Sequence, residues 1–193
     1  MSPPREGRAP RAAGRRSGAG PAAARGSRAR GAGVPRPAAV DVRWIGARPF
    51  ASEAEIRRTA RAALREGRRA DLRLSVALVP DRALARLHAE WLGDPAPTDV
   101  LSFDLSDGSS SAGEIVASHE CARRTARARG VDPRRELALY VVHGVLHLCG
   151  HDDHAPRQRA AMRAAERRVL ATLGWPDDDA PHDEIVVRRP RAS

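Results

Sequence analysis

Four of the seven histidines lie within one thirteen-residue stretch, 142–154, together with two aspartates. His143 and His147 are four residues apart, so on a helix both imidazoles lie on the same face. Histidine pairs with this spacing bind one divalent metal ion, and a catalytic zinc ion takes a third protein ligand and an open position for water. Gly150 can end the helix in a left-handed turn. The residues that follow, His151–His154, could then supply the third ligand.

The alternative to a metal site is a pair of structural histidines in the core. The apolar run Leu137–Val142 precedes the pair and has no polar face, which predicts a buried helix. Buried ring nitrogens need polar partners, and the sequence of this helix offers no other groups to supply them. The spacing therefore favours metal binding over structural histidines.

Three motifs resemble those of the YbeY-type endoribonucleases, which are bacterial rRNA maturation factors. The stretch His143–Asp152 is similar to the signature of that family. Upstream, Pro97–Phe103 resembles its Pro-Thr-Asp/Asn-Val-Leu-Ser-Phe strand, and Gly113–Val116 resembles its Gly-Asp/Glu-Ile strand. The resemblance covers about 40–173, in the same order and with the same spacing.

The resemblance implies one zinc ion per chain, held by His143 and His147, with a zinc-bound water for catalysis and no separate base identified. The third ligand of the family is commonly a histidine, at the position of Asp153. Here the histidine comes one residue later, at His154. Carboxylate and imidazole are both competent zinc ligands. Asp153 is favoured because it needs no shift in the chain, and His154, which would need a one-residue bulge, is the alternative.

A second departure concerns an arginine that many family members carry five residues before the proline of the strand motif. That arginine is implicated in activity, and Leu92 stands at its position here. Arg82 and Arg86, which belong to the helix expected just before, are candidates to replace it.

The family resemblance implies a zinc-dependent endoribonuclease that acts on single strands in rRNA processing. The implied roles are maturation of the 16S rRNA 3′ end and ribosome quality control, with ribosomal RNA and the small ribosomal subunit as partners and no nucleotide cofactor. A zinc peptidase is disfavoured because its general-base glutamate would follow the first histidine, where Gly144 stands. An RNA-binding assembly factor that does not cleave stays open because of Leu92.

Other polar residues near these motifs have less certain roles. Asp152 or His151 could orient a ligand imidazole by hydrogen bonding. Thr98 and Asp99 either line the cleft or cap the strand, and capping is favoured. His119, which opens the helix after the Gly-Glu-Ile strand, is either a surface residue or a substrate contact.

Hydrophobic periodicity predicts four strands and five helices, hence an α+β fold in which a four-stranded mixed sheet packs with helices. The zinc site is expected on a buried helix. Strands are expected at 40–44, 72–78, 100–105 and 113–117. Helices are expected at 52–68, 80–91, 121–129, 133–149 and 156–173.

The positive charge is concentrated at the N-terminus. The net charge is +10, every basic residue is arginine, and residues 1–37 hold nine arginines and one glutamate. This composition predicts a disordered Arg/Ala/Gly/Pro-rich tail, followed by the catalytic domain at 38–176 and a solvated C-terminal tail at 177–193. The first tail could be an RNA-contacting arm, a transit peptide or a segment without a role.

Two cysteines, Cys121 and Cys149, do not make a disulfide framework and suit a reducing compartment. Cys149 is expected to be a small buried apolar residue rather than a ligand. The longest apolar run is too short to span a bilayer, and the N-terminus lacks the apolar segment of a secretory signal. A cytoplasmic location without membrane contact is therefore expected.

Overall fold

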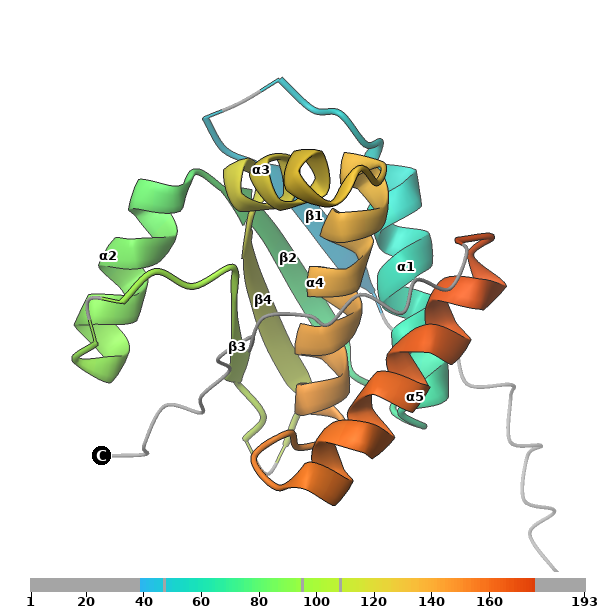
Figure 1. The fold of residues 1–193 in the computed structure, drawn as a ribbon. Helices are drawn as coiled ribbons and strands as arrows, with labels where there is room; N and C mark the ends of the chain where they lie inside the picture. Colours follow the sequence, from blue (N-terminus) through green and yellow to red (C-terminus); the bar gives the residue numbers. More distant parts are fainter. Residues whose placement is uncertain (1–38, 47, 95, 108, 176–193) are drawn as a thin grey trace, which may run out of the picture. The chain divides into compact units, whose positions relative to one another are not determined.

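The computed structural model describes residues 39–46, 48–94, 96–107 and 109–175, so both predicted tails lie outside the described residues. Along the chain the elements are β1 (Val40–Trp44), α1 (Glu53–Glu66), β2 (Arg73–Val79), α2 (Asp81–Leu92), β3 (Val100–Asp104), β4 (Ala112–Ser118), α3 (His119–Arg129), α4 (Pro133–Leu148) and α5 (Pro156–Thr172) (Figure 1). The predicted α+β class, with four strands and five helices in the described part, is confirmed.

The four strands form one mixed sheet in the order β1-β2-β4-β3. β1, β2 and β4 run parallel, and β3 is antiparallel to β4. Val76 of β2 pairs with Ile115 of β4, which in turn pairs with Ser102 of β3. The long connections that parallel strands require are helical here, whereas β3 and β4 are joined by a short loop.

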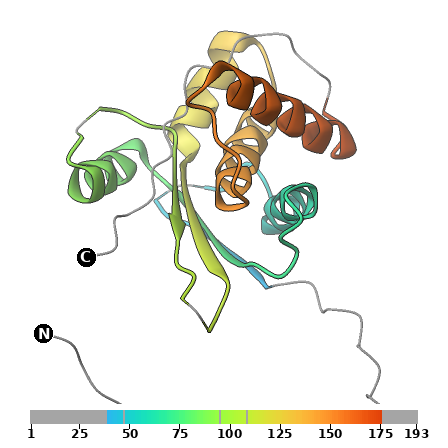
Figure 2. The same ribbon diagram turned by 90° about the horizontal axis from the view of Figure 1, so that it is seen from below.

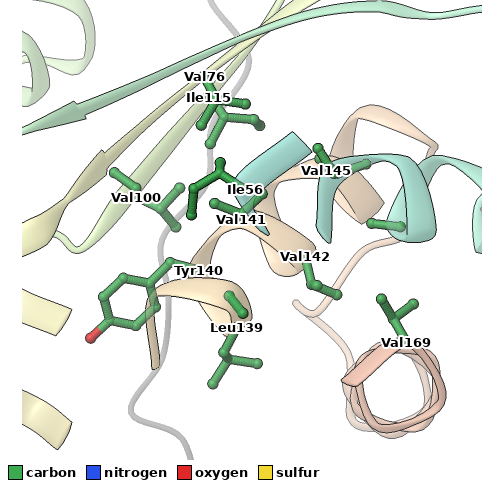
Figure 3. Packing of buried hydrophobic residues seen from close by; sticks show 14 of the residues in the cluster. Ile56, Val76, Val100, Ile115, Leu139, Tyr140, Val141, Val142, Val145 and Val169 are labelled. Carbon is green, nitrogen blue, oxygen red and sulfur yellow. The ribbon is translucent and has the colours of Figure 1, made fainter. Parts of the chain in front are cut away.

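The two faces of the sheet carry different cores. One face, with Val76 and Ile115, packs in the main cluster with Val141 and Val145 of α4 (Figure 3). The alternate residues, including Leu101 and Phe103 of β3, belong to a smaller cluster around Leu84 of α2. Seen from below, α2 lies on one side of the sheet, and α1, α4 and α5 lie on the other (Figure 2).

Helix α4 is buried along almost its whole length. Its N-terminus is capped by Asp132, whose Oδ1 accepts a hydrogen bond from the Arg134 amide at 2.8 Å, and Pro133 stands at the first helical position. Beyond its C-terminus, Gly150 has φ of 92°, which gives the expected left-handed turn. The chain therefore reverses directly after the second histidine. In the described part of the chain, no helix is both long and apolar enough to cross a membrane.

Gly144 allows α4 to lie close against β3 and β4. A Cβ atom at this position would lie 2.8 Å from Ser102 Oγ and 2.9 Å from Ile115 Cδ1. The Ser102 hydroxyl donates a hydrogen bond of 3.0 Å to the Gly144 carbonyl. The absence of a side chain at Gly144 therefore lets α4 pack at this short distance from the sheet, and this packing positions the neighbouring His143.

Candidate metal centre

Three potential ligand atoms converge at the C-terminal end of α4. The Nε2 atoms of His143 and His147 are 2.9 Å apart. Asp153 places Oδ2 at 3.7 Å from His143 Nε2 and Oδ1 at 3.8 Å from His147 Nε2. A tetrahedral zinc ion with bonds of about 2.0–2.2 Å holds its ligands about 3.3–3.6 Å apart. The two distances to Asp153 lie just above this range, and the distance between the histidine nitrogens lies below it, so the two rings would have to move apart by about 0.4 Å to hold one such ion. The three side chains form a His/His/Asp group that could hold a metal ion.

The protonation of the site also suits a metal. Burial and the neighbouring His143 lower the pKa of His147 to about 4. A neutral imidazole keeps a lone pair for a metal ion, whereas an imidazolium does not. Asp153 adds a carboxylate whose side chain is 19% exposed, compared with 4% for His143. The site can thus be reached from solvent on the Asp153 side.

Hydrogen bonds fix the loop that carries Asp153. Arg159 Nη1 of α5 donates to the Asp153 carbonyl at 2.9 Å, and the Asp153 amide donates to Asp152 Oδ1 at 2.8 Å. His154 lies further out: its side chain is 75% exposed, and its Nδ1 hydrogen-bonds to Asp152 Oδ1. The loop therefore brings Asp153 to the histidine pair and groups His154 with the two aspartates.

This geometry predicts that Asp153→Ala weakens zinc binding far more than His154→Ala does. Loss of a direct ligand should lower affinity by about 100-fold or more, since even outer hydrogen-bond partners are worth 10–100-fold. His154→Ala should change affinity less than about threefold, because the side chain is mostly outside the centre. Competition with a chromophoric chelator measures both, and the opposite ranking would assign His154 as the ligand.

Glu166 of α5 is the functional residue that sequence reasoning missed. Its Oε1 lies 2.6 Å from His143 Nδ1, and both side chains are 4% exposed. A carboxylate on the far ring nitrogen fixes the tautomer and orientation of a ligand histidine. The available signal was an acidic residue at core spacing, between Met162 and Val169. The expectation that Asp152 orients an imidazole at the centre is corrected, because its partner is the exposed His154.

Thr98 and Asp99 lie where β3 begins. The Asp99 carbonyl accepts a hydrogen bond from the Ser118 amide at 2.8 Å, which joins β3 to the end of β4. Burial raises the pKa of Asp99 to about 6. Hydrogen bonds from the backbone amides of Asp99 and Val100, and the electrostatic interaction with His143, lower this pKa but do not outweigh the burial. These amide contacts support the predicted strand-capping role.

The raised pKa predicts that Asp99→Asn stabilises the zinc-free protein at neutral pH. The folded state binds the Asp99 proton more tightly than the unfolded state, so stability falls as pH rises from about 4 to about 6. Above that range the variant should be more stable by on the order of 1–3 kcal/mol, and near pH 3.5 the two proteins should be equal. Urea unfolding at both pH values checks this. A difference that does not vary with pH would contradict it.

His119 is not a surface residue, so that expectation was wrong, and its role as a substrate contact stays a prediction. The side chain is 2% exposed, its Nε2 lies 3.1 Å from the Ile45 carbonyl, and its ring stacks on Trp44. Leu92 packs with the smaller cluster on the α2 face of the sheet. Arg82 and Arg86 are exposed on α2, and neither forms a hydrogen bond to the metal centre within the described residues.

Cys149 directly follows α4 and is partly buried. Its Sγ lies so close to Gly67 that a Cβ there would be 2.4 Å away. Burial raises the pKa of Cys149 to about 11. Zinc binds the thiolate, so this environment supports the expected apolar role.

Comparison with known proteins adds to this geometry. The family model described as Endoribonuclease YbeY matches residues 47–174. Three relatives carry the same description. The Myxococcus xanthus protein is 38% identical over 125 residues, which cover 62% of this chain and 42% of the relative. The Kineococcus radiotolerans protein is 37% identical over 122 residues, which cover 56% of this chain and 70% of the relative. A Rhodopseudomonas palustris protein is 35% identical over 134 residues, which cover 65% of this chain and 80% of the relative.

The aligned segment thus spans less than half of the Myxococcus xanthus relative. A solution structure from Thermotoga maritima aligns with a TM-score of 0.49 at 19% identity, covering 74% of this chain and 99% of that protein, which is too weak a likeness to extend the assignment. The matched segment includes both histidines, Asp153 and the two strand motifs. On the strength of the family-model match, the chain belongs to the YbeY family.

Proposed function

We propose that this chain is a zinc-dependent endoribonuclease that cleaves single-stranded RNA during rRNA processing. The observation that carries the proposal is the convergence of His143, His147 and Asp153, in a chain whose family is described as an endoribonuclease. When bound, a zinc ion activates water and polarises a phosphoryl oxygen. The three converging side chains could hold an ion that supplies this chemistry.

The side chains around the centre divide the work. His143 and His147 supply nitrogen donors, and Asp153 supplies carboxylate oxygens on the side open to solvent. Glu166 holds the His143 ring, so that its Nε2 and not its Nδ1 faces the other ligands. Substrate would approach from the side of Asp153, because His143 and Glu166 close the opposite side.

A peptidase function has no structural support at Gly144. The missing Cβ of this residue faces Ser102 and Ile115, toward the sheet and not toward the ligand atoms. A glutamate here would collide with β3 and β4 and could not serve as the general base of a peptidase. Phosphodiester hydrolysis is therefore the better match.

We further propose ribosomal RNA and the small ribosomal subunit as partners, with maturation of the 16S rRNA 3′ end and ribosome quality control as roles in the cytoplasm. The arginine surplus supports a polyanionic partner. The competing proposal is an RNA-binding assembly factor that does not cleave. It is favoured by Leu92, which packs in the smaller cluster and stands where the family resemblance implies an arginine implicated in activity.

Purified protein should cleave a short end-labelled single-stranded RNA and leave the matching duplex intact. Chelator should abolish cleavage and added zinc should restore it, since the His/His/Asp group is the expected holder of the ion that activates water. Folded, zinc-loaded protein that binds the strand without cutting it would favour the assembly factor. Hydrolysis of a peptide substrate instead would reinstate the peptidase.

A further inference from the structure

Four exposed arginines follow one side of α1 and its C-terminal end: Arg58, Arg61, Arg65 and Arg68, here called the α1 arginine stripe. The spacing of the first three arginines, three and four residues, is that of one helix face, and Arg68 follows just after the helix ends. The opposite face is buried, with Ile56, Ala60, Ala63 and Leu64 among its core residues. Within the described part of the chain, no ion pair or side-chain hydrogen bond engages any of the four guanidinium groups.

The neighbouring Arg57 shows what a paired arginine on this helix looks like. It forms an ion pair of 2.6 Å with Glu53 and donates to the Val40 carbonyl at 3.1 Å. Within the described residues none of the four has a direct ion pair of this kind, although Arg58 is attracted by Glu55 three residues earlier. Like charges three and four residues apart destabilise a helix. A polyanion bound along the stripe would remove this repulsion.

Arg68 follows α1 in a left-handed backbone conformation. Its φ is 55°, the only positive value for a non-glycine residue in the described part. Glycine or asparagine usually occupies such a position after a helix, because a side chain there is strained. The preceding Gly67 has φ of −75° and is needed for a different reason, its close contact with Cys149. The positive φ closes the end of α1: the Arg68 amide donates to the Arg65 carbonyl at 3.1 Å, and the Arg69 amide donates to the Leu64 carbonyl at 2.9 Å. This cap leaves the Arg68 side chain exposed at the end of the stripe.

The C-terminal end of the stripe lies near the chain that leaves the metal helix. Gly67 contacts Cys149, which is two residues beyond His147. Glu66 forms an ion pair of 2.7 Å with Arg168 of α5, so the end of α1 is tied to α5 as well (Figure 1). Arg58 and Arg65 are about 10 Å apart along the helix axis. The stripe can therefore contact several phosphates of one strand.

We propose that the α1 arginine stripe binds the phosphate backbone of single-stranded RNA outside the metal centre. This inference rests on the proposed function, because it identifies where that substrate is held. Arginine suits the role because its planar fork of donors matches phosphate oxygens. The contacts are to phosphates, so they are independent of base sequence and weaken with salt.

The test compares two triple variants of the full chain. Arg58→Gln/Arg61→Gln/Arg65→Gln removes three charges from the stripe. Arg43→Gln/Arg73→Gln/Arg127→Gln removes three exposed charges from β1, β2 and α3 and serves as the matched control. Affinity for a labelled uridine 12-mer RNA is read by stopped-flow anisotropy before turnover, over a series of salt concentrations.

The stripe variant should flatten the slope of log affinity against log salt by about 2, since each lost phosphate contact on a single strand contributes about 0.7. Its cleavage rate at saturating RNA and its melting temperature should not fall. The control should keep the wild-type slope, and a lysine version of the stripe should restore it. Equal flattening in both glutamine variants would show only an effect of net charge and would overturn the proposal, as would an unchanged slope in the stripe variant.

Arg68→Gly separates backbone strain from RNA contact. Relief of the positive φ should raise the melting temperature by about 2–4 °C. The same change should flatten the salt slope by about 0.7. A more stable protein with unchanged RNA affinity would exclude Arg68 from the stripe. If the wild-type protein binds RNA through the stripe but does not cleave it, the proposed function is refuted and this inference stands. If the protein cleaves RNA but its RNA affinity does not depend on the stripe, this inference is refuted and the proposed function stands.

Discussion

Replacing His143 and His147 together by alanine is expected to remove the zinc ion and reduce RNA cleavage to background. Their Nε2 atoms, 2.9 Å apart, are two of the three converging donors, and a single carboxylate left behind cannot hold the ion. Zinc per chain, measured by elemental analysis, should fall from one equivalent to below about a tenth, as expected for a site left with one ligand. Cleavage of a single-stranded oligonucleotide should be lost with it.

His154→Ala is the matched control for this experiment, because it removes a nearby imidazole that is mostly exposed. The control should keep its zinc and most of its activity. Circular dichroism confirms that each variant is folded. A folded double variant that still carries one equivalent of zinc would refute the assignment of these histidines.

Substitution of Glu166 should produce the second large effect. Glu166→Gln keeps an acceptor for His143 Nδ1 but removes the charge, and Glu166→Ala removes both. Zinc affinity should fall by about 10-fold in the first and up to about 100-fold in the second, the range expected for hydrogen-bond partners of metal ligands. Glu166→Ala should also destabilise the zinc-free protein by about 1–3 kcal/mol, because a buried ring N–H loses its partner.

Competition for zinc and urea unfolding measure the two effects separately. If Glu166 has only a structural role, both substitutions should lower the free energy of unfolding. Zinc affinity, compared at equal folded fraction, should then stay unchanged. That result would remove Glu166 from the account of the centre.

The elements were predictable because their signals are local. Ser52 and Glu55 cap α1 reciprocally, with the Ser52 amide donating to Glu55 Oε2 at 2.8 Å. Strict alternation from Leu72 to Leu78 marked β2, and Asp132-Pro133 marked the start of α4. Several boundaries moved by one or two residues. For example, α3 begins at His119 rather than Cys121, because the Ser118 hydroxyl accepts from the Cys121 amide and starts the helix early.

The tertiary pairings could not be predicted in this way. Glu166 and His143 are 23 residues apart on different helices, and periodicity does not say which helix faces which. The burial of His119 depends on Trp44 and Ile45, which are more than 70 residues earlier in the chain. Position in the motif favoured Asp153 over His154, but it could not give the hydrogen bonds of Asp152 that hold the two residues in the loop.

The most direct test of a zinc-dependent nuclease at this centre is a zinc titration of metal-free protein, with RNA cleavage as the readout. Cleavage of a single-stranded oligonucleotide should be absent at the start, rise in proportion to added zinc and level off at one equivalent per chain, since the described residues supply one complete His/His/Asp set. Cleavage by the metal-free protein, or none at one equivalent of bound zinc, would contradict it.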